Sequence, residues 1–265
     1  MAHYPHWLPK LQEEIDAVCG DRMPELEDVP NMPRLRATCK EMLRWRQSTP
    51  LGVPHVTLED DVYNGYHIPK GAICHANNFL ISREPKQFPK GDQFIPERWL
   101  DPAYPTYKEP LTEFPNLRGD FAFGYGNRAC PGTDLTSLEL FTLYGALASC
   151  FDIKAPEGTE HIPWYEVHPY VITMTKPFPM DIKPRSEAKA KLIMEMCPDD
   201  AGYTLMGKSR LFIKCSIKIG TLANIDIYRN QEDPLGLDLH GWRKAVRLGR
   251  THHTVREASE AKSLP

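Results

Sequence analysis

The chain has 265 residues, of which 41% are hydrophobic and 25% are charged, and its formal net charge is −3 at pH 7. These values are close to globular averages, so they exclude a disordered chain and lack the strong basic charge typical of nucleic-acid-binding proteins. The 25 prolines are the outlier, and they predict many turns and abrupt helix ends.

Cysteine usage and hydropathy set further limits. The seven cysteines are scattered and no C-x-x-C pair occurs, which argues against a disulfide framework or a cysteine-rich zinc site and indicates a reducing compartment. No apolar run approaches the ~18 residues of a membrane-spanning helix, and the N-terminus has no basic-then-apolar secretory signal. For the chain as given, we therefore expect a cytoplasmic location.

Two helices are predicted near the N-terminus. Residues 11–18 have an amphipathic pattern, and Gly20 is the expected stop. Apolar residues recur at helical spacing over residues 33–47, with Asn31 as the expected N-cap and Pro33 in the first turn. The prolines that follow are expected to end this second helix.

Short strands are predicted next. Residues 55–58 are a candidate strand, and Asn64-Gly65 between apolar residues is a strong hairpin signal. We expect residues 72–76 to pair with this hairpin and residues 77–83 to form a brief helix.

A long coil precedes the clearest predicted helix. Residues 85–115 contain seven prolines and little periodicity, so we expect a coil that is ordered by packing. Residues 133–151 have rows of leucine and phenylalanine that predict an almost wholly buried helix. An alternating strand at residues 171–175 and a polar helix at residues 184–196 are expected to follow.

Cys130 lies in the segment FAFGYGNRACPG, which directly precedes that buried helix. Glycines allow positive φ and close backbone approach, and the start of a helix favours an anion, so this setting suits a thiolate. From the residues alone, three roles remain open. Cys130 is a buried cysteine in a turn, a nucleophile activated by a histidine elsewhere in the chain, or a metal ligand.

The spacing Phe123-x-x-Gly126-x-Arg128-x-Cys130-x-Gly132 resembles the haem-binding loop of cytochromes P450. The resemblance implies that Cys130 is the proximal thiolate ligand of the iron in haem b, iron protoporphyrin IX. It also implies that Arg128 faces a haem propionate, that Phe123 packs beside the cysteine, and that Gly126 and Gly132 shape the loop.

Three further residues resemble the structural network of the same family. Glu41 and Arg44 match its Glu-x-x-Arg helix pair, and Arg98, in the sequence PERW, matches the third member. The resemblance implies a structural role, in which two guanidinium groups around one carboxylate lock the coil onto the core. Without the resemblance, Glu41 and Arg44 would be an exposed ion pair that contributes about 0–1 kcal/mol.

His55 ends the segment TPLGVPH, which resembles the family segment that lines the substrate pocket and then reaches the haem. The resemblance implies that His55 faces a propionate. The alternative is a surface histidine at the end of a strand.

The resemblance implies an α+β, mainly helical fold: the C-terminal part of the cytochrome P450 fold, with small β-sheets and a long coil before the ligand loop. The chain resembles the C-terminal half of fungal biosynthetic P450 monooxygenases. We expect residues 1–196 to form this partial domain. Residues 197–265 match nothing in the family and are expected to be poorly ordered, although residues 211–219 are a candidate strand and residues 243–262 are basic.

The implied function is a haem-thiolate monooxygenase that inserts one oxygen atom of O2 into a small organic substrate. Electrons would come from NADPH through NADPH–cytochrome P450 reductase, which would dock on the cysteine side near Arg118 and Arg128. Full-length members of the family are held at the endoplasmic reticulum membrane by an N-terminal anchor, so membrane association is expected only where that anchor is present. No nucleic-acid partner is expected.

The sequence departs from the family in one respect that keeps two alternatives open. We find no Ala/Gly-Gly-x-Asp/Glu-Thr stretch, which in the family delivers protons to bound dioxygen. The alternatives are therefore a truncated, catalytically inactive P450 fragment and a haem-free interaction or thiol protein.

Overall fold

The computed structural model describes residues 1–159, 167–168, 172–176 and 178–196. In this part of the chain the α-helices are α1 (Trp7–Cys19), α2 (Pro33–Trp45), α3 (Asn78–Ile81), α4 (Thr133–Cys150) and α5 (Glu187–Met196). The 3₁₀ helices are η1 (Leu26–Asn31), η2 (Pro96–Trp99), η3 (Phe121–Phe123) and η4 (Gly126–Arg128). The strands are β1 (His55–Val56), β2 (Asp61–Tyr63), β3 (Tyr66–Ile68), β4 (Ile73–Cys74), β5 (Phe151–Lys154), β6 (Val167–His168), β7 (Met174–Thr175) and β8 (Asp181–Pro184).

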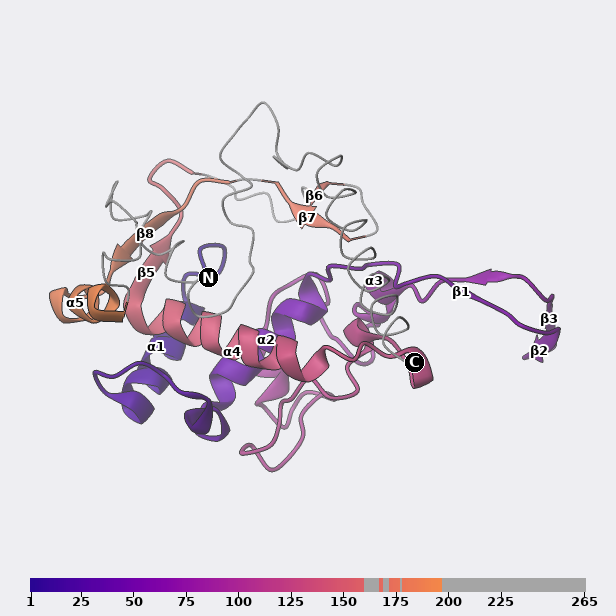
Figure 1. Ribbon diagram of the computed structural model, residues 1–265, viewed down its shortest axis with the longest axis horizontal. Helices are drawn as coiled ribbons and strands as arrows, with labels where there is room; N and C mark the ends of the chain where they lie inside the picture. The colour runs from indigo at the N-terminus through magenta and orange to yellow at the C-terminus, as the bar shows by residue number, and fades with distance from the viewer. Residues whose placement is uncertain (160–166, 169–171, 177, 197–265) are drawn as a thin grey trace, which may run out of the picture. The chain divides into compact units, whose positions relative to one another are not determined.

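The described strands form small antiparallel pairs beside a mainly helical core. The pairs are β1 with β4, β2 with β3, β5 with β8, and β6 with β7. Helix α4 packs against both α1 and α2 (Figure 1). This arrangement confirms the α+β, mainly helical prediction.

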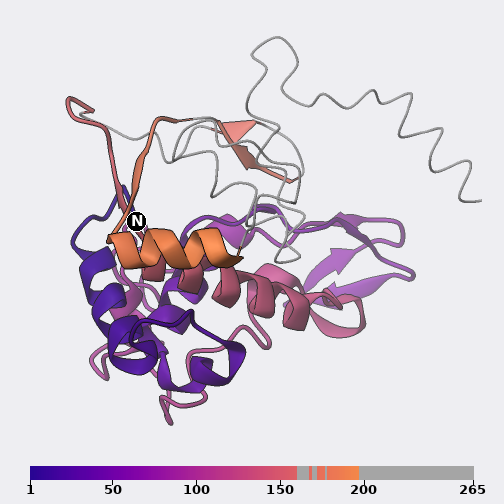
Figure 2. The ribbon, with the colours of Figure 1, turned by 60° about the vertical axis from the view of Figure 1, so that its left-hand side comes forward.

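The main apolar cluster lies between α1, α2 and the part of α4 from Leu140 onward; the ribbons of these helices are drawn in Figure 2. Leu11, Ile15 and Leu35 are almost completely buried there, as expected for apolar residues that share one helix face. Helix α4 lies close to this cluster at Gly145, where a Cβ would be in ordinary van der Waals contact with Leu35 and Pro24, at 3.5 Å. The other buried members are Leu8, Cys19, Met32, Cys39, Ala148, Cys150, Phe151, Ile153 and Ile193.

Helix α2 begins at Pro33, as predicted, but the expected N-cap at Asn31 is wrong, because Asn31 ends η1. The two oxygens of Glu14, on α1, instead accept the backbone N–H groups of Arg34 at 2.8 Å and Leu35 at 2.9 Å. A side chain from another helix thus satisfies donors that a local cap normally satisfies.

The hairpin prediction is confirmed. Strands β2 and β3 pair with Tyr63 opposite Tyr66. Asn64 and Gly65 between them have φ values of 50° and 82°, as a two-residue type I′ turn requires.

The expected pairing of residues 72–76 with that hairpin is wrong. Strand β4 pairs with β1, with His55 opposite Cys74. The Thr57 N–H donates to Ala72 O at 3.1 Å and the Gly71 N–H donates to Thr57 O at 3.0 Å. The segments before and after the hairpin therefore pair with each other.

The proline-rich coil is confirmed, since η2 is the only helix within residues 85–115. Helix α4 has the predicted extent, but it is not almost wholly buried. Its buried residues lie at the C-terminal end, whereas Leu135 is 61% exposed and Leu138 is 44% exposed. The apolar core packs against α4 from Leu140 onward.

The last described elements return to the N-terminal helix. Arg185 follows β8 and binds Asp16 of α1 at 2.5 and 2.9 Å.

Strand β7 lies within the strand predicted at residues 171–175, of which residue 171 is outside the described residues. The predictions for residues 197–265 also lie outside them.

Candidate functional site

The segment around Cys130 is a loop that folds back on itself between η3 and α4. Cys130 is an exposed, free cysteine. Its backbone N–H donates to Phe123 O at 2.7 Å, and the Thr133 hydroxyl donates to Cys130 O at 3.0 Å. The alternative of a buried cysteine in a turn is wrong, because Cys130 is exposed. The two hydrogen bonds hold its backbone in place.

Two glycines give the loop its curvature. Gly124 and Gly126 have φ values of 79° and 61°, in the left-handed region that glycine adopts without strain. A Cβ on Gly126 would meet nothing within 4 Å. Glycine is therefore favoured at this position by its backbone conformation and not by a lack of space. Gly132 differs, because its Cβ would lie 3.5 Å from the Cys130 Sγ. The loop therefore bends around the sulfur and leaves it open.

The residues beside Cys130 fit a haem. Tyr125, Leu135 and Leu138 are exposed apolar side chains within eight positions of the cysteine, and Arg128 is an exposed cation. A porphyrin offers large apolar faces and anionic propionates, and its iron takes a single thiolate. Among the described residues no group of three or more His, Cys, Asp or Glu side chains is placed to hold a metal ion.

His55 is exposed at the first position of β1. Its position agrees with a surface histidine at a strand end, which was the alternative role. A contact between His55 and a propionate stays a prediction.

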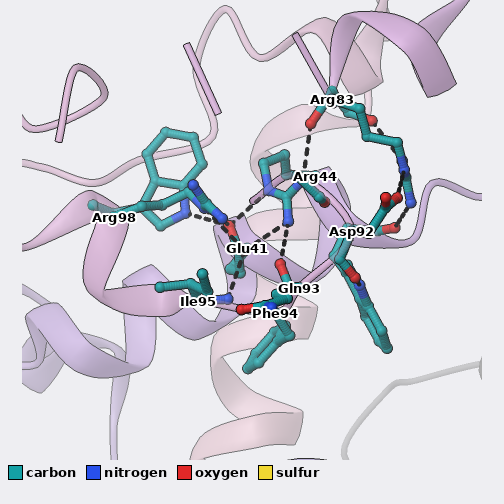
Figure 3. Close-up of polar contacts among 12 residues, drawn as sticks. Glu41, Arg44, Arg83, Asp92, Gln93, Phe94, Ile95 and Arg98 are labelled. Carbon is teal, nitrogen blue, oxygen red and sulfur yellow. Dashed lines mark hydrogen bonds and ion pairs between the residues drawn. The ribbon is translucent and has the colours of Figure 1, made fainter. Parts of the chain in front are cut away.

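The structure brings Glu41, Arg44 and Arg98 together (Figure 3), and all three are completely buried. Arg44 donates from Nη2 to Glu41 Oε1 at 2.8 Å and from Nε to Oε2 at 2.9 Å, and Arg98 Nε lies 3.1 Å from both oxygens. The Ile95 N–H and the Trp99 indole N–H donate to the same carboxylate at 2.8 and 2.9 Å. The alternative of an exposed ion pair is therefore wrong.

The two arginines also bind the backbone of the coil. Arg44 Nη1 donates to Ser82 O and Gly91 O, and its Nη2 donates to Gln93 O, each at 2.8 Å. Arg98 Nη1 donates to Pro89 O at 3.1 Å. These bonds supply donors for backbone carbonyl oxygens that a segment without regular structure cannot satisfy internally.

A second set of contacts on α2 was not predicted. Lys40 Nζ lies 3.0 Å from Asp120 Oδ2 and donates to Asn116 O at 2.5 Å. One turn earlier, Arg36 donates to Leu111 O and, at 3.5 Å, to Pro115 O. Helix α2 therefore binds both the early and the late part of the coil. Lys40 and Asp120 are 80 positions apart, and no local spacing relates them.

None of the helices in the described part of the chain has the length and apolar character that crossing a bilayer requires. This finding concerns only residues whose structure is described.

Comparison with known proteins identifies relatives of the chain. The family model described as Cytochrome P450 matches residues 1–182. The chain is 40% identical over 200 residues to cytochrome P450 monooxygenase psoD of Aspergillus fumigatus, and the match covers 74% of this chain and 39% of that protein. It is 38% identical to cytochrome P450 monooxygenase virE of Hypocrea virens, with 76% and 38% covered.

A solved structure of a zebrafish cytochrome P450 has the same arrangement, with a TM-score of 0.59 and 29% sequence identity. That match covers 69% of this chain and 42% of the zebrafish chain. The chain therefore spans well under half the length of the curated relatives that it matches.

Proposed function

Because the chain belongs to the cytochrome P450 family, we propose that it forms the haem-ligand portion of a monooxygenase, with Cys130 as the proximal ligand. The observation that supports this best is the exposed Cys130 thiol in a loop bent by left-handed glycines at the start of α4. The proposed reaction is R–H + O2 + NADPH + H⁺ → R–OH + H2O + NADP⁺. Haem b, when bound, supplies the activation of dioxygen, which thiolate ligation favours.

The chain's own residues bind and orient this group. The bond from the Cys130 N–H to Phe123 O fixes the direction in which the sulfur leaves the loop. Arg128 is the cation for one propionate and His55 is a second partner at the haem edge. Gly132 lies beside the sulfur, where a Cβ would be in van der Waals contact with it at 3.5 Å.

The buried cluster of Glu41, Arg44 and Arg98, called the Glu41 network below, has a structural role in this proposal. Its three charged groups are completely buried and bind the coil rather than an open site, so they contact neither substrate nor haem. Their task is to order the segment that leads to the ligand loop.

The proposed partners follow from the family. NADPH–cytochrome P450 reductase would dock near the exposed side chains of Arg118 and Arg128, and the substrate would be a small organic molecule. Full-length relatives would be placed at the endoplasmic reticulum membrane. We propose that residues 1–196 are the P450 portion and that residues 197–265 are a separate extension.

A second candidate is a chain that binds haem without turnover. The sequence supports it, because it contains no Ala/Gly-Gly-x-Asp/Glu-Thr stretch, which in the family delivers protons to bound dioxygen.

Ferrous-CO difference spectroscopy of the haem-reconstituted chain tests the ligand assignment. We expect a red-shifted Soret band in the wild type that is lost in Cys130→Ala. Cys74→Ala is the matched control, since Cys74 is also an exposed free cysteine, and it should retain the band. Identical spectra for wild type and Cys130→Ala would refute the proposal. Product formation with reductase and NADPH then distinguishes a monooxygenase from a chain that only binds haem.

A further inference from the structure

Lys40 and Asp120 form a nearly buried ion pair between α2 and the segment that enters the ligand loop. The two charged atoms are 3.0 Å apart, and the side chains are 14% and 3% exposed. A carboxylate buried to this degree depends on its charged partner for stability, because little water reaches it to compensate if that partner's charge is removed.

Asp120 also starts the loop that presents Cys130. Its Oδ1 accepts the Ala122 N–H at 3.0 Å as the N-cap of η3, and its backbone oxygen accepts the Phe123 N–H at 3.0 Å. Phe123 O in turn accepts the Cys130 N–H at 2.7 Å. An unbroken series of polar contacts therefore runs from the Lys40 ammonium to the backbone of Cys130.

The other end of the pair is anchored in the core. The Lys40 ammonium lies 5.0 Å from the centre of the Trp99 ring. The Trp99 indole N–H donates to Glu41 Oε2 at 2.9 Å. Lys40 therefore lies beside the Glu41 network and faces the ligand loop.

We propose that Lys40 is a positioning residue that acts through Asp120 to fix the ligand loop, and thereby the direction of the Cys130 sulfur. The inference rests on the proposed function only where it concerns haem. Without the ammonium, the Asp120 carboxylate gains stability by turning toward water. This movement weakens the cap on Ala122 and loosens the start of the loop.

Hydrogen exchange of the haem-free chain of 265 residues tests this directly. In Lys40→Met we expect the amides of Ala122, Phe123 and Cys130 to exchange at least about tenfold faster, since residues in one network are energetically coupled. Lys10→Met is the matched control, because Lys10 also pairs with a carboxylate, Glu97, and lies over a tryptophan ring. Equal protection of the loop in Lys40→Met and Lys10→Met would overturn the inference.

A double variant separates loop positioning from general destabilisation. Asp120→Asn keeps an oxygen for the Ala122 N–H and removes the charge that Lys40 neutralises. We therefore expect loop protection in Lys40→Met/Asp120→Asn to be closer to wild type than in Lys40→Met. If the double variant exchanges as fast as Lys40→Met, Lys40 does not act through Asp120.

The haem-dependent readout is kept separate. In reconstituted Lys40→Met, we expect the thiolate-type ferrous-CO band to lose intensity to a band without thiolate character, with no such change in Lys10→Met. A wild-type chain without a thiolate-type band contradicts the proposed function, whereas the exchange measurements alone decide the positioning role.

Discussion

Glu41 is a completely buried carboxylate that faces two guanidinium groups, an indole N–H and a backbone N–H. Each donor replaces part of the hydration that the carboxylate loses on folding. Such a cluster is a weak source of net stability, but removal of one member leaves the others uncompensated. Its importance therefore lies in fixing one arrangement of the coil.

We predict that Glu41→Gln lowers the free energy of unfolding by about 3–5 kcal/mol, because Arg44 and Arg98 then remain buried without a counter-charge. Urea denaturation of the haem-free chain measures the loss. Glu97→Gln is the control, since Glu97 and Lys10 are a solvent-exposed pair whose loss should cost at most about 1 kcal/mol. A cost for Glu41→Gln as small as the control's would contradict a buried network.

The left-handed glycines of the ligand loop allow a second prediction at single positions. Gly126 has a φ of 61° and open space around its missing Cβ. Gly126→Ala should therefore cost about 1–2 kcal/mol from backbone strain alone, and Gly126→Asn should cost less, because asparagine tolerates this conformation. Thermal or chemical denaturation measures both. If alanine and asparagine cost the same, strain at φ is not the cause.

The sequence was sufficient for part of this site. Glu41 and Arg44 are three positions apart on one helix, and the glycine loop is contiguous, so both are visible as local patterns. Lys40 and Asp120 meet only because the coil folds across α2, and that path depends on packing without periodicity. The direction of the Cys130 side chain likewise follows from the tertiary structure.

At the scale of elements, α2 depends on α1 for its start. The two oxygens of Glu14 accept the first free N–H groups of α2, whereas the neighbouring Glu13 makes an exposed ion pair with Arg34. Two adjacent glutamates therefore have different roles in the same helix contact.

We predict that Glu14→Ala lowers the free energy of unfolding by about 1–2 kcal/mol, as the loss of a helix cap does. Glu13→Ala is the adjacent control and should cost at most about 1 kcal/mol, because its side chain is 73% exposed. Denaturation in urea compares the two variants side by side. A larger cost for Glu13→Ala than for Glu14→Ala would show that α2 is not capped from α1.

The elements that were predicted well are those determined by neighbouring residues. The hairpin follows from Asn64-Gly65, and the end of α1 follows from Gly20. The cap of α2 and the partner of β4 were wrong because both depend on residues far along the chain. The burial of α4 was overestimated because its sequence is apolar on all sides and does not show which half the core covers.

At the scale of the whole described structure, three cysteines belong to the main apolar cluster. Cys19, Cys39 and Cys150 are at most 7% exposed. Burial raises the pKa of the Cys19 thiol to about 11, raises that of Cys150, and holds that of Cys39 far above its usual range. The folded chain therefore keeps these protons at a pH where an unfolded thiol, with a pKa near 8.5, loses them.

This difference predicts that the chain loses stability in alkaline solution. Below a pH of about 8.5 both states bind the thiol protons and the contribution is complete, whereas above it the unfolded state binds fewer protons, so the free energy of unfolding falls as pH rises. Each such thiol contributes a slope of about 1.4 kcal/mol per pH unit until its folded pKa is reached. Denaturation midpoints measured under reducing conditions between pH 7.5 and 9.5 (about one unit below and above the unfolded pKa) should therefore decline. Cys39→Ala should be less stable at neutral pH but have a shallower decline, and an unchanged slope in that variant would contradict the assignment of a buried, protonated thiol to the core.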